Sequence, residues 1–547
     1  MSNNNKEELL FFNGINGSTG EYLLLPLTPE QISKIAQGEE LDPAHINELQ
    51  RKNRQIQGLD PEFAPIEGVD PKNLAETGWG VIFAYGADSA IKEALSPLLK
   101  LRQQQATQKK EHYYQEYIDV KAYRPGETKN KFLARHNVGP GPADPDKMPY
   151  YLLIVGDPET IPYSFQYQLD VQYAVGRIYF DTLQEYAQYA HSVVAAETSK
   201  LPLPRTASFF GVQNSEDKAT RLSADQLIKP LAEWVAKDQP SWNVQTLLKD
   251  ETTKARLGQL LGGSETPSLL FTASHGMGFD NGDPLQERHQ GAILCQDWPG
   301  QYKWRGAIPE DFYFSADDIS NDARLLGLIT FHFACYGAGT PKLNDFAHHE
   351  FSKRSAIAPH AFVANLPRRL LSHPQGGALA VVGHVERAWG YSFMWETPGA
   401  QLQVFQSALK RLMEGHPVGS ALEFFNQRYA ELSSDLNHQL EEIKFGAKAD
   451  DLAVADMWTA NNDARSYAII GDPAVRLVVS NENVVERPII EKVTFQATPI
   501  GENPVQSDVM EEQRPTYLNQ IPSQDWEKTP ASVKKLVEDM ALRLEEL

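Results

Sequence analysis

Cysteine is scarce in this sequence, which has only Cys295 and Cys335 among its 547 residues. Two cysteines exclude a disulfide framework and a cysteine-rich zinc site. The adjacent His348 and His349 lack a third ligand at useful spacing, so we interpret them as a solvated loop rather than a metal site. The sequence also lacks a Gly-rich phosphate loop and a Gly-x-Ser-x-Gly elbow, which argues against nucleotide-binding and serine-hydrolase functions. No cofactor is therefore expected.

Basic charge and long apolar runs are scarce as well. The net charge is −21, whereas a protein that binds nucleic acid or an anionic membrane needs a basic face for phosphate contacts. No run approaches the roughly eighteen apolar residues of a membrane span, and the first residues, Met1–Glu8, lack the apolar core of a signal segment. We therefore expect a cytoplasmic protein with no nucleic-acid or membrane partner.

What the sequence does contain is a regular alternation of short apolar runs and helical patterns, among them a helix expected over 217–237. Its 41% apolar and 22% charged residues are typical of a folded soluble protein. The alternation predicts an α/β fold with a doubly wound, mostly parallel sheet and helices on both faces, in two subdomains. The expected parts are an N-terminal accessory region (1–75), a first α/β subdomain (76–200), a second α/β subdomain (201–480) and a flexible acidic tail ending in an amphipathic helix (481–547).

Two of the apolar runs share one pattern. Leu269–Gly276 ends in Ser-His-Gly, and Leu328–Gly339 breaks into Cys-Tyr-Gly-Ala-Gly. Each run fits a strand buried on both faces of a parallel sheet, because no alternation is needed where helices cover both sides. Reactive groups in such sheets lie just past the carboxyl ends of the strands. His275 and Cys335 both occupy that position.

These two side chains can form a nucleophile and its proton partner. A thiol with a pKa of about 8.5 is only a few per cent ionised at neutral pH, and a nearby imidazole can accept its proton or stabilise the thiolate. Gly276 and Gly337 would let a substrate backbone approach and let N–H groups point at an oxyanion. A lone cysteine in an apolar strand is more often a packing residue, which is our interpretation of Cys295. The pairing with His275 favours a catalytic Cys335.

Together with further motifs, this pair resembles the gingipain and CHAT branch of the caspase-like (clan CD) cysteine peptidases. The motifs cover most of the chain, and in order they are Gly156–Pro162, Asp170–Tyr173, Gly176-Arg177, Ser274-His275-Gly276, Ala334-Cys335-Tyr336-Gly337 and Gly471-Asp472-Pro473. The resemblance implies a caspase-like fold and peptide-bond hydrolysis through a thioester. Cys335 would be the nucleophile, His275 would handle the proton on the leaving amine, and the N–H groups of Gly276 and Cys335 would hold the oxyanion.

The resemblance also suggests residues for the surroundings of this pair. Glu159 falls where gingipain-type enzymes have an acidic residue near the histidine, although a surface carboxylate fits the sequence equally well. Asp170 falls where such enzymes receive a basic substrate side chain, since a carboxylate at the base of a pocket would select Arg or Lys. A structural turn is the alternative for Asp170. Trp389 would wall that pocket or belong to the core.

The function predicted from the resemblance is a cysteine endopeptidase that cleaves protein or peptide substrates, after Arg or Lys, in a regulated intracellular pathway of bacterial defence or signalling. An activating protein or ligand is a further expected partner. Two alternatives stay open: a catalytically silent caspase-like scaffold that binds partners, and another thiol enzyme such as an acyl transferase. The C-terminal helix, which starts at Thr529-Pro530, would dock on its own domain, recruit a partner or regulate access.

Overall fold

The computed structural model describes residues 9–10, 13–24, 26–38, 65–66, 68–139, 141–198, 203–344, 355–390, 393–394, 401–480 and 487–495. All of these belong to a unit that extends to Phe495. The residues from Gln496 onward form a second unit, and the helix predicted at Thr529 lies there, outside the described residues. His348 and His349 also lie outside the described residues.

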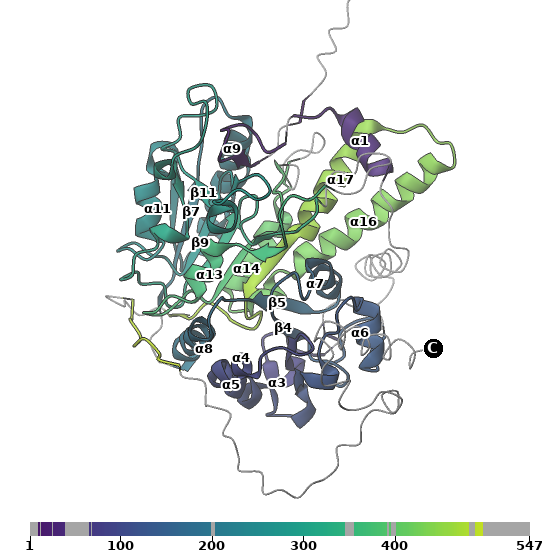
Figure 1. The fold of residues 1–547 in the computed structure, drawn as a ribbon, viewed down its shortest axis with the longest axis vertical. Coiled ribbons are helices and arrows are strands. Elements are labelled where there is room, and N and C mark those ends of the chain that lie inside the picture. Colours follow the sequence, from purple (N-terminus) through teal and green to yellow (C-terminus); the bar gives the residue numbers. More distant parts are fainter. Residues whose placement is uncertain are drawn as a thin grey trace, which may run out of the picture. The chain divides into compact units, whose positions relative to one another are not determined.

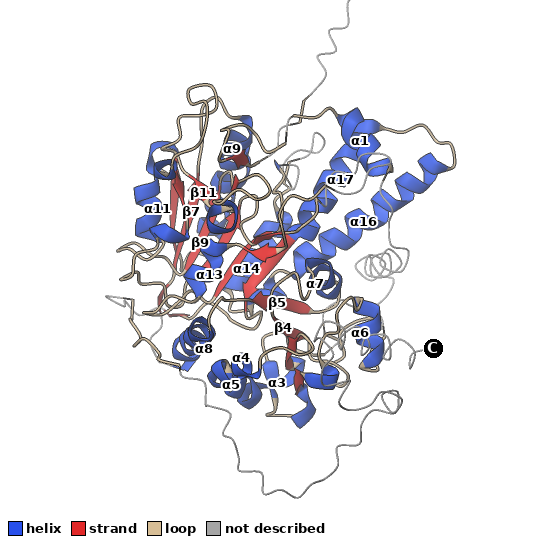
Figure 2. Cartoon of the chain, viewed as in Figure 1, coloured by secondary structure: helices blue, strands red, loops and turns tan. Residues whose placement is uncertain are grey.

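Ten strands form one central sheet, drawn in red in Figure 2. Seven of them are buried along their whole length, which explains why their sequences show no apolar–polar alternation. The α/β class and the mostly parallel sheet are therefore confirmed. In their order across the sheet, the strands are β3 (Tyr114–Tyr117), β2 (Trp79–Phe83), β4 (Tyr151–Val155), β5 (Ala174–Ile178), β17 (Tyr467–Gly471), β16 (Ala380–His384), β13 (Ile329–Phe333), β9 (Leu269–Ala273), β7 (Thr206–Gly211) and β8 (Asn243–Leu248).

The sheet consists of two sets of parallel strands that run in opposite directions. All neighbouring strands are parallel except β16 and β17, which are antiparallel. Strands β16, β13, β9, β7 and β8 therefore end at one edge of the sheet, and the other five end at the opposite edge. In the first set, the chain goes outward from β7 to β8 and returns past β7 to β9. Ligands in such sheets bind at this reversal, just outside the carboxyl ends of the two strands.

Helices surround the sheet in Figure 1. Their bounds are α1 (Pro29–Gln37), α3 (Leu74–Thr77), α4 (Ser89–Ala94), α5 (Ser96–Ala106), α6 (Lys129–Arg135), α7 (Tyr163–Asp170), α8 (Leu183–Thr198), α9 (Lys218–Ser223), α10 (Lys229–Asp238), α11 (Lys254–Leu260), α12 (Gln286–His289), α13 (Asn365–Leu371), α14 (Gln403–Met413), α15 (Val418–Ala421), α16 (Glu423–Lys444) and α17 (Asp451–Ser466). No helix in the described ranges has both the length and the apolar character that crossing a membrane requires.

Helix α1 fixes the N-terminal part of the chain to the rest of the fold. Thr28 and Gln31 cap its first turn through reciprocal hydrogen bonds, so the helix begins directly after Thr28. Its buried Ile32 and Ala36 belong to a small apolar cluster that also contains Trp458 of α17. Figure 1 shows α1, in purple, beside α17. Helix α1 is thereby joined to a helix from the end of the fold.

Residues 13–24 form what we call the N-terminal hairpin. Strand β1 (Ile15–Asn16) pairs in parallel with β10 (Met277–Gly278), and Ile15 also bridges Tyr22 on the returning limb. The N–H of Leu23 donates to the carbonyl of Gly14, which closes the two limbs on each other. Three further short strand pairs are β11 (Ile293–Leu294) with β12 (Tyr313–Phe314), β14 (Gly339–Thr340) with β15 (Phe362–Val363), and β6 (Leu203–Pro204) with β18 (Val479–Ser480).

Candidate active site

His275 and Cys335 lie side by side because their strands are neighbours in register. Strands β9 and β13 are parallel, and their last residues, Ala273 and Phe333, face each other in the sheet. His275 and Cys335 each follow two residues later, so both emerge at the same height above the same edge. This edge is also the one at which the strand order reverses between β7 and β9, where open α/β sheets bind ligands. The structure therefore brings together the two residues that the sequence pairs.

The imidazole of His275 is held in one orientation by two partners. Its Nε2 lies 2.7 Å from Oδ2 of Asp217, and its Nδ1 accepts a hydrogen bond of 2.8 Å from the backbone N–H of Gly14. A backbone N–H is only a donor, so Nδ1 carries the lone pair and Nε2 carries the proton that it donates to the carboxylate. The side chain of His275 is fully buried. The nitrogen that faces the site is therefore Nδ1.

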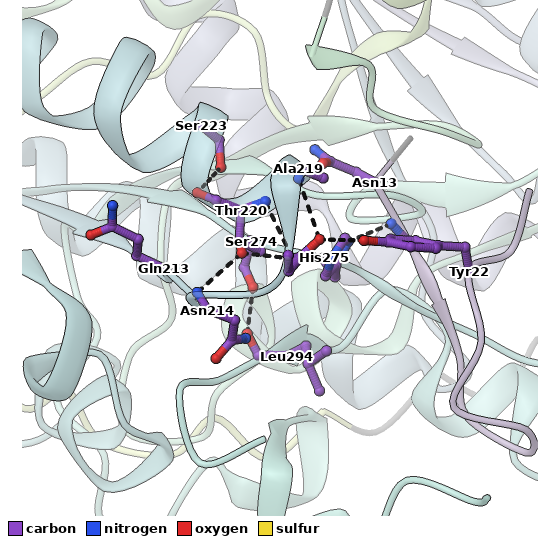
Figure 3. Close-up of polar contacts among 12 residues, drawn as sticks. Asn13, Tyr22, Gln213, Asn214, Ala219, Thr220, Ser223, Ser274, His275 and Leu294 are labelled. Carbon is purple, nitrogen blue, oxygen red and sulfur yellow. Dashed lines mark hydrogen bonds and ion pairs between the residues drawn. The ribbon is translucent and has the colours of Figure 1, made fainter. Parts of the chain in front are cut away.

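Asp217 is a carboxylate with no exposure to solvent. It caps helix α9, where it accepts hydrogen bonds from the backbone N–H groups of Ala219 and Thr220 and from Oγ1 of Thr220. Its Oδ1 accepts a hydrogen bond of 2.5 Å from the hydroxyl of Tyr22. Figure 3 shows Tyr22, Ala219, Thr220 and His275 around this group. Burial alone would raise the pKa of Asp217, but His275 and these donors hold it well below its usual range.

The thiol of Cys335 is buried and neutral in this arrangement. Its Sγ donates to the carbonyl oxygen of Asn13 at 3.0 Å and accepts from the backbone N–H of Ala388 at 3.3 Å. Burial raises the pKa of Cys335 to about 12. The sulfur therefore keeps its proton in this arrangement, and a base has to remove the proton before the sulfur can act as a nucleophile.

One peptide group contacts both reactive side chains. The carbonyl oxygen of Asn13 meets Sγ of Cys335, and the N–H of the same peptide bond, on Gly14, meets Nδ1 of His275. Gly14 has a φ of +105°, and a Cβ added to it would lie 2.6 Å from Leu23 and 3.0 Å from Sγ of Cys335. Glycine is therefore required at the point where this chain passes between the thiol and the imidazole.

Gly276 is packed against the backbone of Cys335. A Cβ on Gly276 would lie 1.8 Å from the carbonyl oxygen of Cys335, so only glycine fits here. Within the described part of the chain, the backbone N–H groups of Gly276 and Cys335 donate to no acceptor. The loop that carries Gly276 is fixed by Ser274, whose hydroxyl donates to the carbonyl of Leu294 (Figure 3).

The two carboxylates suggested by the resemblance, Glu159 and Asp170, contact residues other than the reactive pair. Glu159 follows β4, whose carboxyl end is at the opposite edge of the sheet, and it accepts the N–H of Ala361 at 3.0 Å and lies 3.5 Å from Nζ of Lys342. Asp170 ends α7 and accepts the N–H of Val175. Neither carboxylate contacts His275 or Cys335 in the ranges that the structure describes.

Trp389 lies close to the thiol in sequence and is almost fully buried. Its backbone N–H donates to Asp463 at 2.9 Å, and its neighbour Ala388 is the residue that contacts Sγ of Cys335. The Trp389 ring belongs to the same apolar cluster as Leu10 and Trp458. Its position is therefore that of a core residue at the wall of the site.

Asp217 is the residue of the site that the sequence pattern did not reveal. The sequence places it only as the first residue of the helix expected over 217–237, where an aspartate is a common cap. A usable signal existed, because Asp217 follows the carboxyl end of β7, and β7 adjoins β9. Recognising it required knowing which strands are neighbours.

The remaining candidate groups are structural. Cys295 is fully buried and bonded to the carbonyl of Ile293, and burial raises its pKa well above the usual range. Among the described residues, no group of three or more His, Cys, Asp or Glu side chains is arranged to hold a metal ion.

Comparisons with known proteins give matches to solved structures at low identity. No family model and no curated protein matches the sequence. The solved structure of the Arg-specific cysteine proteinase gingipain R has a TM-score of 0.46 and 13% identity, over 76% of this chain and 80% of that chain. A complex of Porphyromonas gingivalis RgpB pro- and mature domains has a TM-score of 0.41 and 12% identity, over 74% of this chain and 80% of that chain. At this level of similarity, the function has to be argued from the site.

Proposed function

We propose that this chain is a cysteine endopeptidase with Cys335 as nucleophile and His275 as its proton partner. The observation that carries the proposal is that the thiol and the imidazole contact the two halves of a single peptide group. The carbonyl faces the sulfur and the nitrogen faces Nδ1 of His275, which is the arrangement that amide cleavage by a thiol needs.

Each residue of the site has a role in this chemistry. Nδ1 of His275 takes the thiol proton, the sulfur attacks the carbonyl carbon, and the same nitrogen returns the proton to the leaving amine. Asp217 keeps the proton of the neutral ring on Nε2 and stabilises the imidazolium that forms. The unused N–H groups of Gly276 and Cys335 are our candidates for the oxyanion donors. Water then hydrolyses the thioester and regenerates the thiol.

The backbone beside the site offers a way to bind any extended peptide. The N–H of Ile15 donates to the carbonyl of Gly276, and the N–H of Gly17 donates to the carbonyl of Gly278 at 2.7 Å. A substrate segment that follows the scissile bond would pair with this edge in the same way, as an added strand. Such pairing gives affinity without selecting particular side chains.

Several finer features of the proposal come from the sequence resemblance alone. They are cleavage after Arg or Lys with Asp170 as the pocket acid, a role for Glu159, an activating partner, and an intracellular place in bacterial defence or signalling. The contacts favour Asp217 over Glu159 as the acid beside His275. The other features stay predictions.

The test is cleavage of an unfolded protein such as casein, with the cut sites mapped by mass spectrometry. It should use the full chain and a Gly14→Val chain, in which the new side chain displaces the N-terminal hairpin from Cys335. We expect cleavage that Cys335→Ala abolishes and Cys295→Ala, the matched change at the other cysteine, leaves intact. If both cysteine variants still cleave casein, Cys335 is rejected as the nucleophile. If no chain cleaves casein, the endopeptidase is rejected.

A further inference from the structure

The N-terminal hairpin covers Cys335 and His275, where a substrate would have to bind. Its backbone pairs with β10, the hydroxyl of Tyr22 bonds to Asp217, and the N–H of Ile308 donates to the carbonyl of Gly17 from the other side. The turn of the hairpin is held by two carboxylates, because Asn16 donates to Asp280 and Ser18 donates to Asp283. These contacts hold one particular stretch of the chain in the site.

The hairpin crosses the site in the direction of a substrate. The carbonyl that precedes the Asn13–Gly14 bond faces the nucleophile, and the nitrogen that follows it donates its N–H to Nδ1 of His275, the group proposed to carry the proton. Since a C=O bond measures about 1.23 Å, the carbonyl carbon of Asn13 lies within about 4.2 Å of Sγ. An approach of about 1 Å would bring it to the 3–3.5 Å of a near-attack geometry.

We propose that the Asn13–Gly14 peptide bond is a self-processing site, which the chain cuts once in its own active site to release residues 1–13. The proposal rests on the function proposed above and names its first substrate. Before the cut, the hairpin covers Cys335 and His275. After the cut, the peptide group that spans the thiol and the imidazole is broken, so Asn13 can leave, whereas residues 14–24 keep their contacts with β10 and Asp217.

The step balances in bonds and protons. Sγ of Cys335 forms a bond to the carbonyl carbon of Asn13 while the bond from that carbon to the nitrogen of Gly14 breaks. The thiol proton passes through Nδ1 of His275 to the nitrogen, which leaves as the new amino terminus. Water cleaves the thioester, leaves a carboxylate on Asn13 and restores the thiol.

The same geometry assigns a residue type to the position before the cut. The side chain of Asn13 is 2% exposed, and its Nδ2 has no hydrogen-bond partner among the described residues. A buried space that accepts a short neutral amide would be costly for the charged side chain of Arg or Lys. We therefore expect cleavage after Asn, in contrast to the basic residue that the sequence resemblance suggests.

The experiment follows the intact mass of the purified full-length chain over time. The expected result is loss of residues 1–13 and a new amino terminus at Gly14, in the wild type and in Cys295→Ala but not in Cys335→Ala. The chain supplies an internal control, because Asn16–Gly17 is the same dipeptide only three residues later but has no contact with Cys335. It should stay uncut. A cut within one chain is unimolecular, so its rate constant should not change on dilution by about tenfold.

Two variants separate the possible results. Asn13→Asp should slow the cut by at least about tenfold, because a charge would have to enter the buried space. Gly14→Val should abolish the cut, whereas Gly139→Val, at a glycine with no atom near its Cβ position, should not. If the wild type stays intact while the Gly14→Val chain cuts casein through Cys335, the self-processing site is rejected and the endopeptidase stands. If neither chain cuts anything, both proposals are rejected. A cut at Asn13–Gly14 that persists in Cys335→Ala also rejects self-processing.

Discussion

At the scale of single residues, Asp217 decides how His275 is presented to the thiol. Its carboxylate bonds to Nε2 and leaves Nδ1 facing Cys335 and the scissile peptide group. It acts on the reacting peptide group through the imidazole, so it is a positioning residue.

Replacing Asp217 by Asn should therefore slow catalysis while leaving substrate binding intact. The amide keeps the shape of the carboxylate but loses the charge that stabilises the imidazolium. We expect kcat for Cys335-dependent casein cleavage to fall by about 10²–10⁴-fold with KM little changed. Asp225→Asn, at an exposed aspartate in the π-helical segment Ala224–Ile228, is the matched control and should leave kcat unchanged. An equal loss in both variants would contradict the role of Asp217.

The lowered pKa of Asp217 also predicts how stability depends on pH. A carboxyl group with a folded-state pKa below its unfolded value of about 3.9 stabilises the fold above that pH, and the contribution disappears as pH falls further. In a Cys335→Ala background, which cannot process itself, we expect Asp217→Asn to lower Tm at pH 6. The difference from the parent chain should shrink below about pH 4. Thermal unfolding monitored by circular dichroism measures this, and a difference that stays constant with pH would contradict it.

At the scale of elements, helix α1 is the anchor of the N-terminal hairpin. The hairpin binds the site mainly through backbone contacts, whereas α1 buries apolar side chains against α17. Backbone pairing places the Asn13–Gly14 bond, and the helix keeps the segment from diffusing away.

Weakening this anchor should loosen the first part of the chain without unfolding the sheet. Ile32 is fully buried, so Ile32→Ala should cost about 2–5 kcal/mol of docking free energy. In the Cys335→Ala background, we expect faster amide hydrogen exchange in α1 and in the N-terminal hairpin, with the rates in β9 and β13 unchanged. Glu30→Ala, at an exposed position on the same helix, should leave exchange unaltered. Equal acceleration throughout the sheet would show that α1 belongs to the global core.

At the scale of the whole molecule, a buried ionic cluster links strands β2 and β17 of the central sheet. Asp472 follows β17, and its carboxylate accepts from Nε of Arg102 at 2.6 Å and from Nε1 of Trp79 at 2.9 Å. Arg102 also bonds to Glu197 of α8. These groups come from three distant parts of the chain, and all but Glu197 are almost completely buried.

Removing the acid from this cluster should destabilise the whole unit. Asp472→Ala leaves the buried Arg102 with one carboxylate instead of two, and breaking a buried pair costs about 3–5 kcal/mol. We expect the midpoint of urea unfolding to fall accordingly. Asp146→Ala removes an exposed partner of Lys110 and should lower the midpoint far less, because solvent screens an exposed ion pair. Similar losses of stability in the two variants would show that the buried cluster stabilises the unit no more than an exposed ion pair does.

The sequence predicts buried strands better than edge strands or polar helices. The buried strands β9 and β13 were predicted from their apolar runs, because a strand covered on both faces must be apolar throughout. Strand β3 was missed, since it lies at the edge of the sheet and three of its four residues are only half-buried. Helices α16 and α17 were missed because their polar sequences show no clear apolar face.

The sequence by itself determined the α/β class and the pairing of His275 with Cys335, because both follow from local patterns of apolar residues and strand ends. Only the tertiary structure decided which groups meet this pair. Asp217 reaches His275 because β7 lies next to β9, whereas Glu159 follows a strand that ends at the opposite edge because β16 and β17 are antiparallel. The Asn13–Gly14 bond reaches the site through pairing between residues more than 260 positions apart, and no local pattern records such a contact.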